Sequence, residues 1–597
     1  MHVVATAGHV DHGKSTLVRA LTGMEPDRLE EERRRGLTIE LGYAWTALPS
    51  GERVAFVDVP GHERFLGTML AGVGPVPAVM FVVAADEGWM PQSEEHLVAL
   101  RTLGVRLGLL AVTRADLADP GPAMAEAQAR LAKAGLGDAE AVAVSGRTGV
   151  GLDRLRAALD RLVVALPAPD PGAPVRLWID RAFSVRGSGT VVTGTLPAGR
   201  VRTGDELELD GEPVRVRGLE SLKEHVEAVT GVARVAVNLR GRVAAERGHA
   251  LVTPGAWTRT DLVDVRLTPA EGAEGPDGSG GAAGALPPRL TVHIGSAAVP
   301  CEVRPLGPDA ARLRLARPLP LHLGDVLLLR DPGRDPGRDR SVLRVLAGAA
   351  VLDVRPPGLA RRGAARDRAA ALSQAAPDAA SLLRAHRLLR TADLVAMGCP
   401  PSGRPVLGDW HADPGYWAGL EARLPEVVRR HAARDPLEPG MPLEAARHEL
   451  GLPDRRLVAA LVRPPLAVAD GRIVAGPAGL PAPVAGAVRR LAAELAERPF
   501  LAPDAGRLAA LGLGPRELGA AVRAGALLRI AEGVVLLPGA DRRAAAVLAG
   551  LPQPFTVSQA KTALDTSRRV AVPLLEHLDR AGLTERLDDA HRRCPPR

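Results

Sequence analysis

An eight-residue segment near the amino terminus constrains this chain more than any other part of it. It reads Gly8-His9-Val10-Asp11-His12-Gly13-Lys14-Ser15, follows the apolar run Val3–Ala5 and precedes a stretch with helical periodicity. A strand, a loop of the form GxxxxGK[ST] and a helix together build a phosphate-binding loop. Backbone N–H groups of the loop and the amino end of the helix then point at the same anion. The segment therefore predicts a nucleoside triphosphate site.

Two side chains of this loop have chemical roles in that interpretation. Lys14 reaches the β and γ phosphates, and the Ser15 hydroxyl is offered to Mg²⁺. We predict that the nucleotide is held by the whole loop and by the residue after it, namely Gly8, His9, Val10, Asp11, His12, Gly13, Lys14, Ser15 and Thr16.

Two further motifs supply the γ-phosphate side of such a site. Thr38, in the segment Gly36-Leu37-Thr38-Ile39, can coordinate Mg²⁺ and would be released when the γ-phosphate is lost. Asp58-Val59-Pro60-Gly61-His62 ends the apolar run Val54–Val57. There Asp58 can hold Mg²⁺, Gly61 can approach the γ-phosphate closely, and His62 can orient the attacking water. The predicted Mg²⁺ ligands are thus Ser15, Thr38 and Asp58, and His62 is the predicted catalytic residue.

The base should be read by Thr113-Arg114-Ala115-Asp116, which follows the apolar run Leu109–Val112. One carboxylate accepts both N1–H and the 2-amino group of guanine, a donor pair that adenine lacks, so Asp116 selects GTP over ATP. The usual pattern is Asn-Lys-x-Asp, and two of its four positions differ here. Arg114 can still cover the base with its alkyl stem and guanidinium plane. Backbone N–H groups of Ser145 and Gly146, at the end of another strand, could reach the guanine O6.

Bulk properties limit the remaining possibilities. A chain of 597 residues is too long for one core, and 46% hydrophobic with 24% charged residues is typical of globular domains. The net charge of +7 and a pI near 9.9 suit a polyanionic partner. Three distant cysteines argue against a disulfide framework and favour a reducing compartment. No apolar run is long enough to span a bilayer, and no signal peptide precedes the first strand, so we expect a cytoplasmic protein without membrane contact.

In several short sequence segments, the chain resembles the selenocysteine-specific elongation factors, the SelB type of translational GTPase. The resemblance is carried by the segments ATAGHVDHGKS (5–15), RGLTIELGY (35–43), DVPGHERF (58–65), MLAGVG (69–74) and IDRAFSVRGSGTVVTGT (179–195). Members of this family often have Thr where other GTPases have Asn, which fits Thr113. The resemblance implies a monomer that binds GTP and Mg²⁺, carries selenocysteyl-tRNA, and delivers it to the ribosome at a UGA codon marked by an mRNA hairpin.

The expected domain boundaries follow linkers and strand patterns. A GTPase domain should occupy residues 1–168 and end at the linker Pro167–Pro174. Short alternating runs then predict two β-barrel domains, at 175–256 and 257–356. The second is interrupted by Gly272–Gly284, which we interpret as a flexible loop.

The resemblance places an aminoacyl pocket in the first barrel, lined by Asp180, Arg181 and Arg234. A selenol has a lower pKa than a thiol, so selenocysteine carries charge where serine does not. A cationic pocket would favour the anion, and serine could not compensate the desolvated arginine. The alternative is a surface ion pair between Asp180 and Arg181, which would contribute little.

From about residue 373, helical periodicity, as at Val484–Leu495, and short hairpins, as at Leu528–Leu537, predict winged-helix modules in series. The four modules are 373–426, 427–476, 480–540 and 541–597. In the last module Pro573 should lie in the first turn of a helix or kink it. The end, 588–597, does not resemble a strand and should be frayed. By resemblance the tail grips the mRNA hairpin, with basic side chains against phosphates. The RNA-binding candidates are Lys561, Arg568, Arg569 and Arg580.

The expected fold is therefore multidomain: an α/β P-loop GTPase domain, two β-barrel domains and tandem, mainly α-helical, winged-helix modules. Another translational GTPase of the elongation factor Tu type would share the first two parts but not the tail. A GTP-switched winged-helix regulator of DNA would not need the barrel pair. A nucleotide-metabolism enzyme would need a further catalytic constellation, which the sequence does not show.

Overall fold

The computed structural model describes residues 1–26, 32, 38–62, 65–186, 189–270, 286–332, 345–475 and 479–595. The predicted loop Gly272–Gly284 lies outside these residues, as do Gly36 and Leu37 of the Thr38 motif. The chain divides into two compact units, residues 1–404 with 409–411, and residues 405–408 with 412–597. No helix within the described ranges is both long enough and apolar enough to cross a membrane.

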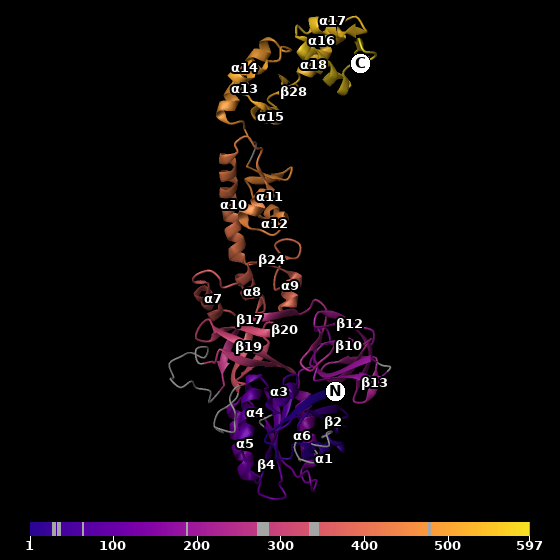
Figure 1. The fold of residues 1–597 in the computed structure, drawn as a ribbon, viewed down its shortest axis with the longest axis vertical. Helices are drawn as coiled ribbons and strands as arrows, with labels where there is room; N and C mark the ends of the chain where they lie inside the picture. The colour runs from indigo at the N-terminus through magenta and orange to yellow at the C-terminus, as the bar shows by residue number, and fades with distance from the viewer. Residues whose placement is uncertain are drawn as a thin grey trace. The chain divides into compact units, whose positions relative to one another are not determined.

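The amino-terminal domain is a six-stranded sheet in the order β2-β3-β1-β4-β5-β6, with β2 antiparallel and the other neighbours parallel. Val3 and Val4 of β1 belong to different core clusters, because successive side chains of a strand point to opposite faces. Helices α1 and α6 cover one face, and α3, α4 and α5 cover the other (Figure 1). The elements are β1 His2–Ala7, α1 Lys14–Thr22, β2 Gly42–Ala47, β3 Arg53–Asp58, α3 Leu66–Val73, β4 Ala78–Ala84, α4 Pro91–Thr102, β5 Leu107–Thr113, α5 Gly121–Lys133, β6 Glu140–Ala143 and α6 Leu152–Ala165.

The first β-barrel domain follows the linker. Its main sheet has the order β7-β16-β11-β12-β15-β9-β8, with β13 paired to β12, and β10 pairs with β14. The runs that alternate in the sequence form strands here, and their apolar members make one core. The strands are β7 Arg176–Trp178, β8 Arg181–Val185, β9 Gly189–Leu196, β10 Arg200–Arg202, β11 Glu206–Leu209, β12 Glu212–Ser221, β13 Glu224–Val226, β14 Ala228–Thr230, β15 Ala233–Leu239 and β16 Ala250–Val252.

The second β-barrel domain is closed, in the order β17-β20-β19-β18-β21-β22. Its strands are β17 Thr258–Pro269, β18 Arg289–Ile294, β19 Ala297–Pro305, β20 Ala310–Leu321, β21 Val326–Arg330 and β22 Val345–Asp353. The helical part of the chain begins at α7 (Ala364–Ser373), earlier than the predicted residue 373. Arg368 of α7 donates to Asp264 (2.6 Å) and to Asp353 (2.7 Å), so this helix is tied to the barrel by buried charges.

The predicted first winged-helix module is not a separate body. Side chains from α8 (Ala379–His386) through α9 (Thr391–Ala396) to Cys399 belong to the core cluster of the second barrel. The predicted boundary between residues 426 and 427 is also wrong, because α10 (Pro414–Arg434) runs through it without a break. Sequence periodicity predicted helices here, but it did not predict that they share a core with the second barrel.

The second unit consists of α10 and three sets of helices with small hairpins. The predicted helix at Val484–Leu495 and the hairpin at Leu528–Leu537 are confirmed as α13 and β28–β29. The elements after α10 are β25 Met441–Pro442, α11 Leu443–Leu450, α12 Arg455–Leu461, β26 Leu466–Ala469, β27 Arg472–Ala475, α13 Ala482–Glu497, α14 Ala505–Ala510, α15 Pro515–Arg523, β28 Leu528–Ala531, β29 Val534–Leu536, α16 Ala540–Ala549, β30 Phe555–Thr556, α17 Val557–Ala563, α18 Arg568–Arg580, β31 Glu585–Arg586 and β32 His591–Arg593.

The last module differs from its prediction in two respects. Residues 591–593 are not frayed, because β32 pairs with both β30 and β31 and Arg592 is buried against Asp579. Pro573 lies in the second turn of α18, which excludes the first-turn alternative of its prediction. One continuous core runs from Ala487 to Leu578, so the predicted third and fourth modules form a single body.

Candidate functional site

The phosphate loop joins β1 to α1, as its motif predicts. Gly8 has φ +128°, and a Cβ there would overlap the Val82 carbonyl, so only glycine fits. Lys14 is buried, and its ammonium donates to the carbonyls of Gly8 (3.0 Å) and His9 (2.6 Å). The lysine charge is therefore held inside the loop, at the amino end of α1, where a helix favours an anion.

Three oxygen-bearing side chains meet beside the loop. The Ser15 and Thr38 hydroxyls are 2.9 Å apart. Asp58 is fully buried; Thr6 donates to one of its oxygens (2.7 Å), and the other has no hydrogen-bond partner among the described residues. Burial raises the pKa of Asp58, whereas the Ser15 hydroxyl and the Lys14 charge lower it. A buried carboxylate oxygen without a donor, beside two hydroxyls, is a donor set that suits Mg²⁺.

The Asp-x-Pro-Gly-His motif leads from β3 toward α3. A Cβ on Gly61 would lie 2.6 Å from the Val10 backbone and would also overlap the Lys14 ammonium, so glycine is required for this close approach to the loop. His62 is half-buried in the turn that follows, and its carbonyl accepts from the Phe65 N–H (2.9 Å). The motif thus lies against the phosphate loop, as predicted.

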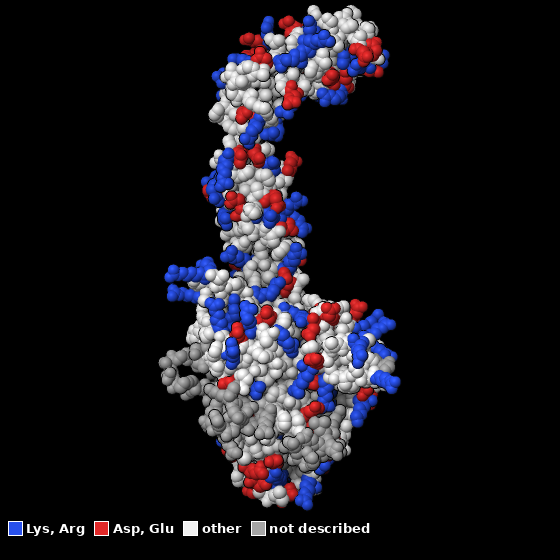
Figure 2. Space-filling view, viewed as in Figure 1, with Lys and Arg blue, Asp and Glu red and all other residues white. Residues whose placement is uncertain are grey.

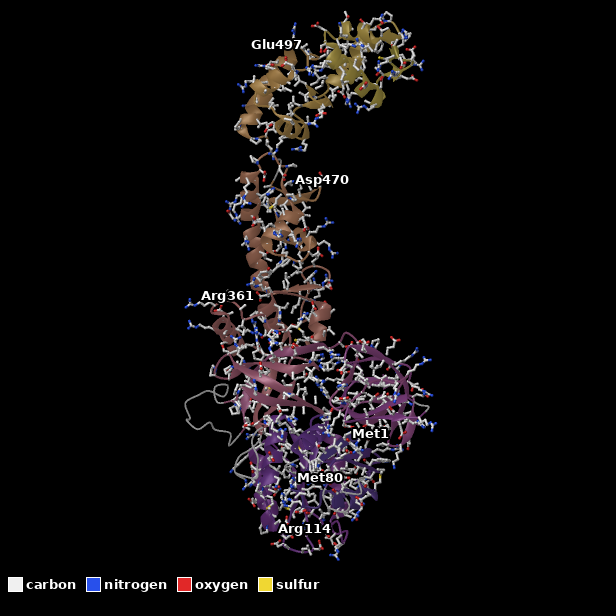
Figure 3. The ribbon with its side chains drawn as sticks, in the orientation of Figure 1. Met1, Met80, Arg114, Arg361, Asp470 and Glu497 are labelled. Carbon is white, nitrogen blue, oxygen red and sulfur yellow. The ribbon has the colours of Figure 1, made fainter. Side chains whose placement is uncertain are left out.

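The base-reading segment is also attached to the loop. The Thr113 hydroxyl donates to the His12 carbonyl (2.8 Å), so threonine bridges the two segments. Arg114, labelled below Met80 in Figure 3, has φ +56°. Its guanidinium donates to Asp86 (2.8 Å), to Glu87 (2.9 Å) and to the Asp11 carbonyl. These contacts fix the guanidinium that replaces the usual lysine.

The two remaining base-site segments lie next to each other. Asp116 is exposed after β5, and the neighbouring Ala115 N–H donates to the Val144 carbonyl (3.3 Å), directly before Ser145. A Cβ on Gly146 would lie 3.3 Å from the Thr16 side chain, so this turn packs on α1. The structure therefore brings together all of the predicted nucleotide-binding segments.

His12 is the loop residue whose side chain is packed into the protein interior. The His12 imidazole is buried, contacts the Val82 carbonyl (3.2 Å), and has a pKa that burial lowers to about 3. The His12 carbonyl accepts the Thr113 hydroxyl, so this residue connects the loop to the base-reading segment through its backbone.

Two positioning residues were missed from the sequence. His96 of α4 accepts the Gly8 N–H at Nδ1 (3.1 Å), and burial lowers its pKa to about 3, which keeps the ring neutral and able to accept. Glu32 accepts the N–H groups of Ile39 and Glu40 (2.9 Å each) and so holds the segment after Thr38. The only sequence signal for Glu32 is its place in the charged run before that threonine.

The predicted aminoacyl trio lies where the first barrel meets β2 of the GTPase domain. Arg234 of β15 makes two hydrogen bonds to Asp180, one of 2.8 Å, and its guanidinium lies 3.8 Å from the centre of the Tyr43 ring. The Tyr43 hydroxyl donates to Asp180 (3.2 Å), and Thr193 donates to the other oxygen (2.6 Å). This ion pair is almost fully enclosed, with 13% of the arginine and 6% of the aspartate side chain exposed.

Arg181 has different partners from its neighbour. It donates to the Leu41 carbonyl (2.7 Å) and pairs with Glu40 (3.0 Å). The alternative prediction, an ion pair between Asp180 and Arg181, is therefore wrong. Both Arg181 and Arg234 line a cavity of about 490 Å³ between the two domains, whose other lining residues include Phe183, Val191 and Lys223. We call this cavity the barrel cleft.

The four basic tail candidates differ in what they contact. Lys561 and Arg568 are exposed and make no hydrogen bond or ion pair with a described residue. Arg569 donates to the carbonyls of Ala502 (2.9 Å) and Pro503 (2.8 Å), which is a structural contact inside the unit. Arg580 donates to the Glu576 carbonyl on its own helix (3.3 Å). Two of the four are thus available to a ligand without breaking a described contact.

Comparisons with known proteins match both ends of the chain. Residues 1–165 match the elongation factor Tu GTP binding domain, and residues 546–593 match the elongation factor SelB winged helix. The selenocysteine-specific elongation factor of Escherichia coli K12 is 38% identical over 368 residues, which cover 60% of this chain and 56% of that relative. This chain thus spans little more than half of the relative's length.

Two further proteins are similar over larger shares of their own length. Elongation factor Tu 2 of Streptomyces avermitilis is 34% identical over 282 residues, 42% of this chain and 72% of that protein. The crystal structure of a bacterial selenocysteine-specific elongation factor, EF-Sec, covers 100% of both chains with a TM-score of 0.73 and 25% identity. The fold of GTPase domain, β-barrel domains and winged-helix modules is therefore that of EF-Sec.

Proposed function

Because the chain belongs to the selenocysteine-specific elongation factors, the SelB branch of the translational GTPases, we propose that it binds selenocysteyl-tRNA with GTP and delivers it to the ribosome at UGA codons marked by an mRNA hairpin. The observation that carries this proposal is the presence, in one chain, of an elongation factor Tu GTP binding domain and a SelB winged helix. We propose that it acts as a monomer in the cytoplasm.

In this proposal the phosphate loop holds GTP through its backbone N–H groups and the Lys14 ammonium. Ser15, Thr38 and Asp58 would hold Mg²⁺, which neutralises phosphate charge when bound. Asp116 accepts the two guanine donors, and Arg114, fixed by Asp86 and Glu87, covers the base edge. His62 orients the attacking water once the ribosome has positioned its ring, so hydrolysis by the isolated protein is slow.

The same contacts connect the nucleotide to the barrel cleft. Thr38, held by Ser15, is followed within three residues by Glu40 and Leu41, which both hold Arg181. Loss of the γ-phosphate would release Thr38 and, with it, the partners of this arginine. Arg181 would then change its surroundings when GTP is hydrolysed, at the moment when the aminoacyl group must leave.

Of the two arginines in the cleft, Arg181 is the better candidate to hold a selenolate. Arg234 is neutralised by an enclosed carboxylate, whereas the partner of Arg181, Glu40, is 50% exposed and can return to water. A desolvated Arg181 would favour selenocysteine and would disfavour serine, which brings no charge. Asp180 and Arg234 then act mainly as the fixed wall of the cleft.

The decisive experiment is competition between selenocysteyl-tRNA and seryl-tRNA on the same tRNA body, with GTP present. We expect a clear preference for selenocysteyl-tRNA, and we expect Arg181→Ala to reduce it. Equal affinity for the two would contradict the proposal and would favour a general factor of the elongation factor Tu type.

The tail is tested separately by truncation after residue 412, at the start of the long segment 412–597 of the second unit. We expect the shortened chain to keep GTP and tRNA binding and to lose affinity for the mRNA hairpin. In the full chain, Lys561→Ala with Arg568→Ala should weaken hairpin binding. Arg569→Ala instead removes the contacts of this arginine with the carbonyls of Ala502 and Pro503 inside the unit. A shortened chain that binds the hairpin as well as the full chain does would contradict the role of the tail.

A further inference from the structure

A groove in the second unit is lined by residues from two different tail segments. Residues 437–439 and Arg472 of β27 form one side, and α15 and β28 form the other. The volume of the groove is about 550 Å³. Its lining contains one carboxylate, Glu438, and four guanidinium groups, those of Arg472, Arg516, Arg523 and Arg529. We call it the arginine groove.

The fold concentrates these charges on one surface. Arg516, Gly519 and Arg523 are three and then four residues apart, so they share one face of α15. A Cβ on Gly519 would lie 3.4 Å from a nitrogen of Arg523 and 3.7 Å from a nitrogen of Arg529. Two guanidinium groups from different elements therefore meet over one glycine, where their like charges repel.

The carboxylates nearby do not balance these charges. Arg472 pairs with Glu438 (2.8 Å), Arg523 donates to the Leu437 carbonyl (3.1 Å), and Arg516 lies 4.0 Å from Asp435. Arg529 makes no hydrogen bond or ion pair with a described residue. Four positive groups thus face two negative ones. In Figure 2 the basic side chains of the tail are mostly interleaved with acidic ones, as for Arg447 with Glu444 (2.7 Å).

We propose that the arginine groove binds the phosphodiester backbone of an RNA stem, as a second RNA contact apart from Lys561 and Arg568. The planar guanidinium matches phosphate oxygens in a two-bond geometry, and converging arginines are relieved by a multivalent anion. The described lining residues include no aromatic side chain on which a base could stack. The groove therefore follows backbone shape and charge, not sequence.

This proposal rests on the proposed RNA-binding role of the tail, but its test needs neither nucleotide nor tRNA. The full chain is titrated into a labelled RNA stem-loop of about 20 base pairs and arbitrary sequence, at several potassium chloride concentrations. For the variant Arg516→Ala with Arg529→Ala we expect about tenfold weaker binding and a salt slope lower by about two, since each phosphate contact contributes about 0.9. The Arg516→Lys, Arg529→Lys variant should keep most of the slope.

The matched control is Arg489→Ala with Arg490→Ala, two exposed arginines of α13 outside the groove, which should bind the stem as the unchanged chain does. Equal affinity and slope for the groove variant and the unchanged chain would overturn the proposal. So would tighter binding of a polyglutamate peptide that depends on Arg516 and Arg529, because the partner would then be an acidic protein.

The two RNA contacts are separated by a second pair of titrations with the mRNA hairpin. Loss of hairpin binding in the Lys561, Arg568 variant, with an unaffected groove variant, would overturn the groove alone. Hairpin binding no tighter than that of the arbitrary stem, but still lowered in the groove variant, would contradict the proposed function and support the groove.

Discussion

The nucleotide site and the barrel cleft are built in opposite ways. The nucleotide site consists of short contiguous motifs at the ends of neighbouring strands, and its key contacts are to backbone atoms, such as those of Lys14 to Gly8 and His9. The cleft depends on side chains that are far apart in sequence, with Arg234 joined to Asp180 and Tyr43.

Because of this difference, substitutions at the nucleotide site should mainly affect activity, whereas substitutions of the enclosed pair in the cleft should mainly affect stability. Two side chains predicted to act at the nucleotide site, His62 and Asp116, are partly or fully exposed and can be changed without leaving a buried charge. In the cleft Arg234 and Asp180 are each other's enclosed partner, so a change at either acts on folding first, whereas Arg181 pairs with the exposed Glu40. The four predictions below test this contrast.

The largest effect is expected at His62. Replacement by Ala should leave GTP affinity unchanged and lower ribosome-stimulated hydrolysis by about 10²–10⁴-fold, the usual contribution of a positioned proton-transfer or water-orienting group. Single-turnover hydrolysis with and without ribosomes measures it. Full stimulated activity in this variant would remove His62 from the mechanism.

The next effect is on stability, at Asp180. Its replacement by Ala leaves Arg234 enclosed without a counter-charge, which should cost about 3–5 kcal/mol. Hydrogen exchange of residues 175–256 in increasing urea measures the local loss. Glu140→Ala, which removes the partner of the exposed Arg161, is the matched control and should cost far less. Similar losses in both variants would mean that enclosure does not matter in the cleft.

Asp116 comes third. Replacement by Asn removes two charge-assisted hydrogen bonds to guanine, which should weaken GTP binding by about 10²–10³-fold and shift preference toward xanthosine triphosphate. Asp119→Asn, three residues further along the same loop, should bind GTP normally. Equilibrium titration with both nucleotides decides the matter, and unchanged GTP affinity in the Asp116 variant would discredit its base-reading role.

The smallest effect is expected at Tyr43. Phe keeps the ring under Arg234 and loses only the hydroxyl bond to Asp180, at a cost of about 0.5–1.5 kcal/mol. Leu loses the ring as well and should cost about 0.5–2 kcal/mol more. Urea unfolding of both variants compares the two contributions. Equal losses would assign the whole effect to the hydroxyl.

The contrast also explains what the sequence could predict. Motifs such as Gly8–Ser15 and Asp58–His62 can be recognised in the sequence because each is a short contiguous segment. Parallel strands bring their carboxyl ends to one edge of the sheet, so the motifs that follow these strands are expected to meet there. His96 and Glu32 could not be found in this way, because each acts on a loop through an isolated contact that leaves no pattern. In the cleft, resemblance pointed to Asp180, Arg181 and Arg234, but the alternative prediction paired Asp180 with the wrong arginine, since pairing depends on three-dimensional neighbours.

The tail shows the same limit at the level of domains. Helical periodicity identified α13, because an apolar stripe is a property of one helix, and two short apolar runs around a glycine identified the β28–β29 hairpin. Periodicity does not tell which core a stripe joins, so residues 379–399 were assigned to a module of their own. The end of the chain was misjudged because a three-residue strand, held by pairing on both sides, has no signature in its own composition.

The shared core at residues 379–399 determines where a chimera of this protein could be joined. A foreign tail grafted at residue 373 would remove Leu382, Leu389, Leu394 and Met397 from the interior of the second barrel and expose its apolar end to water. A graft after residue 412 would exchange nearly all of the second unit and leave that interior sealed. The segment between these positions belongs to the core of the second barrel, although its helices resemble those of the tail.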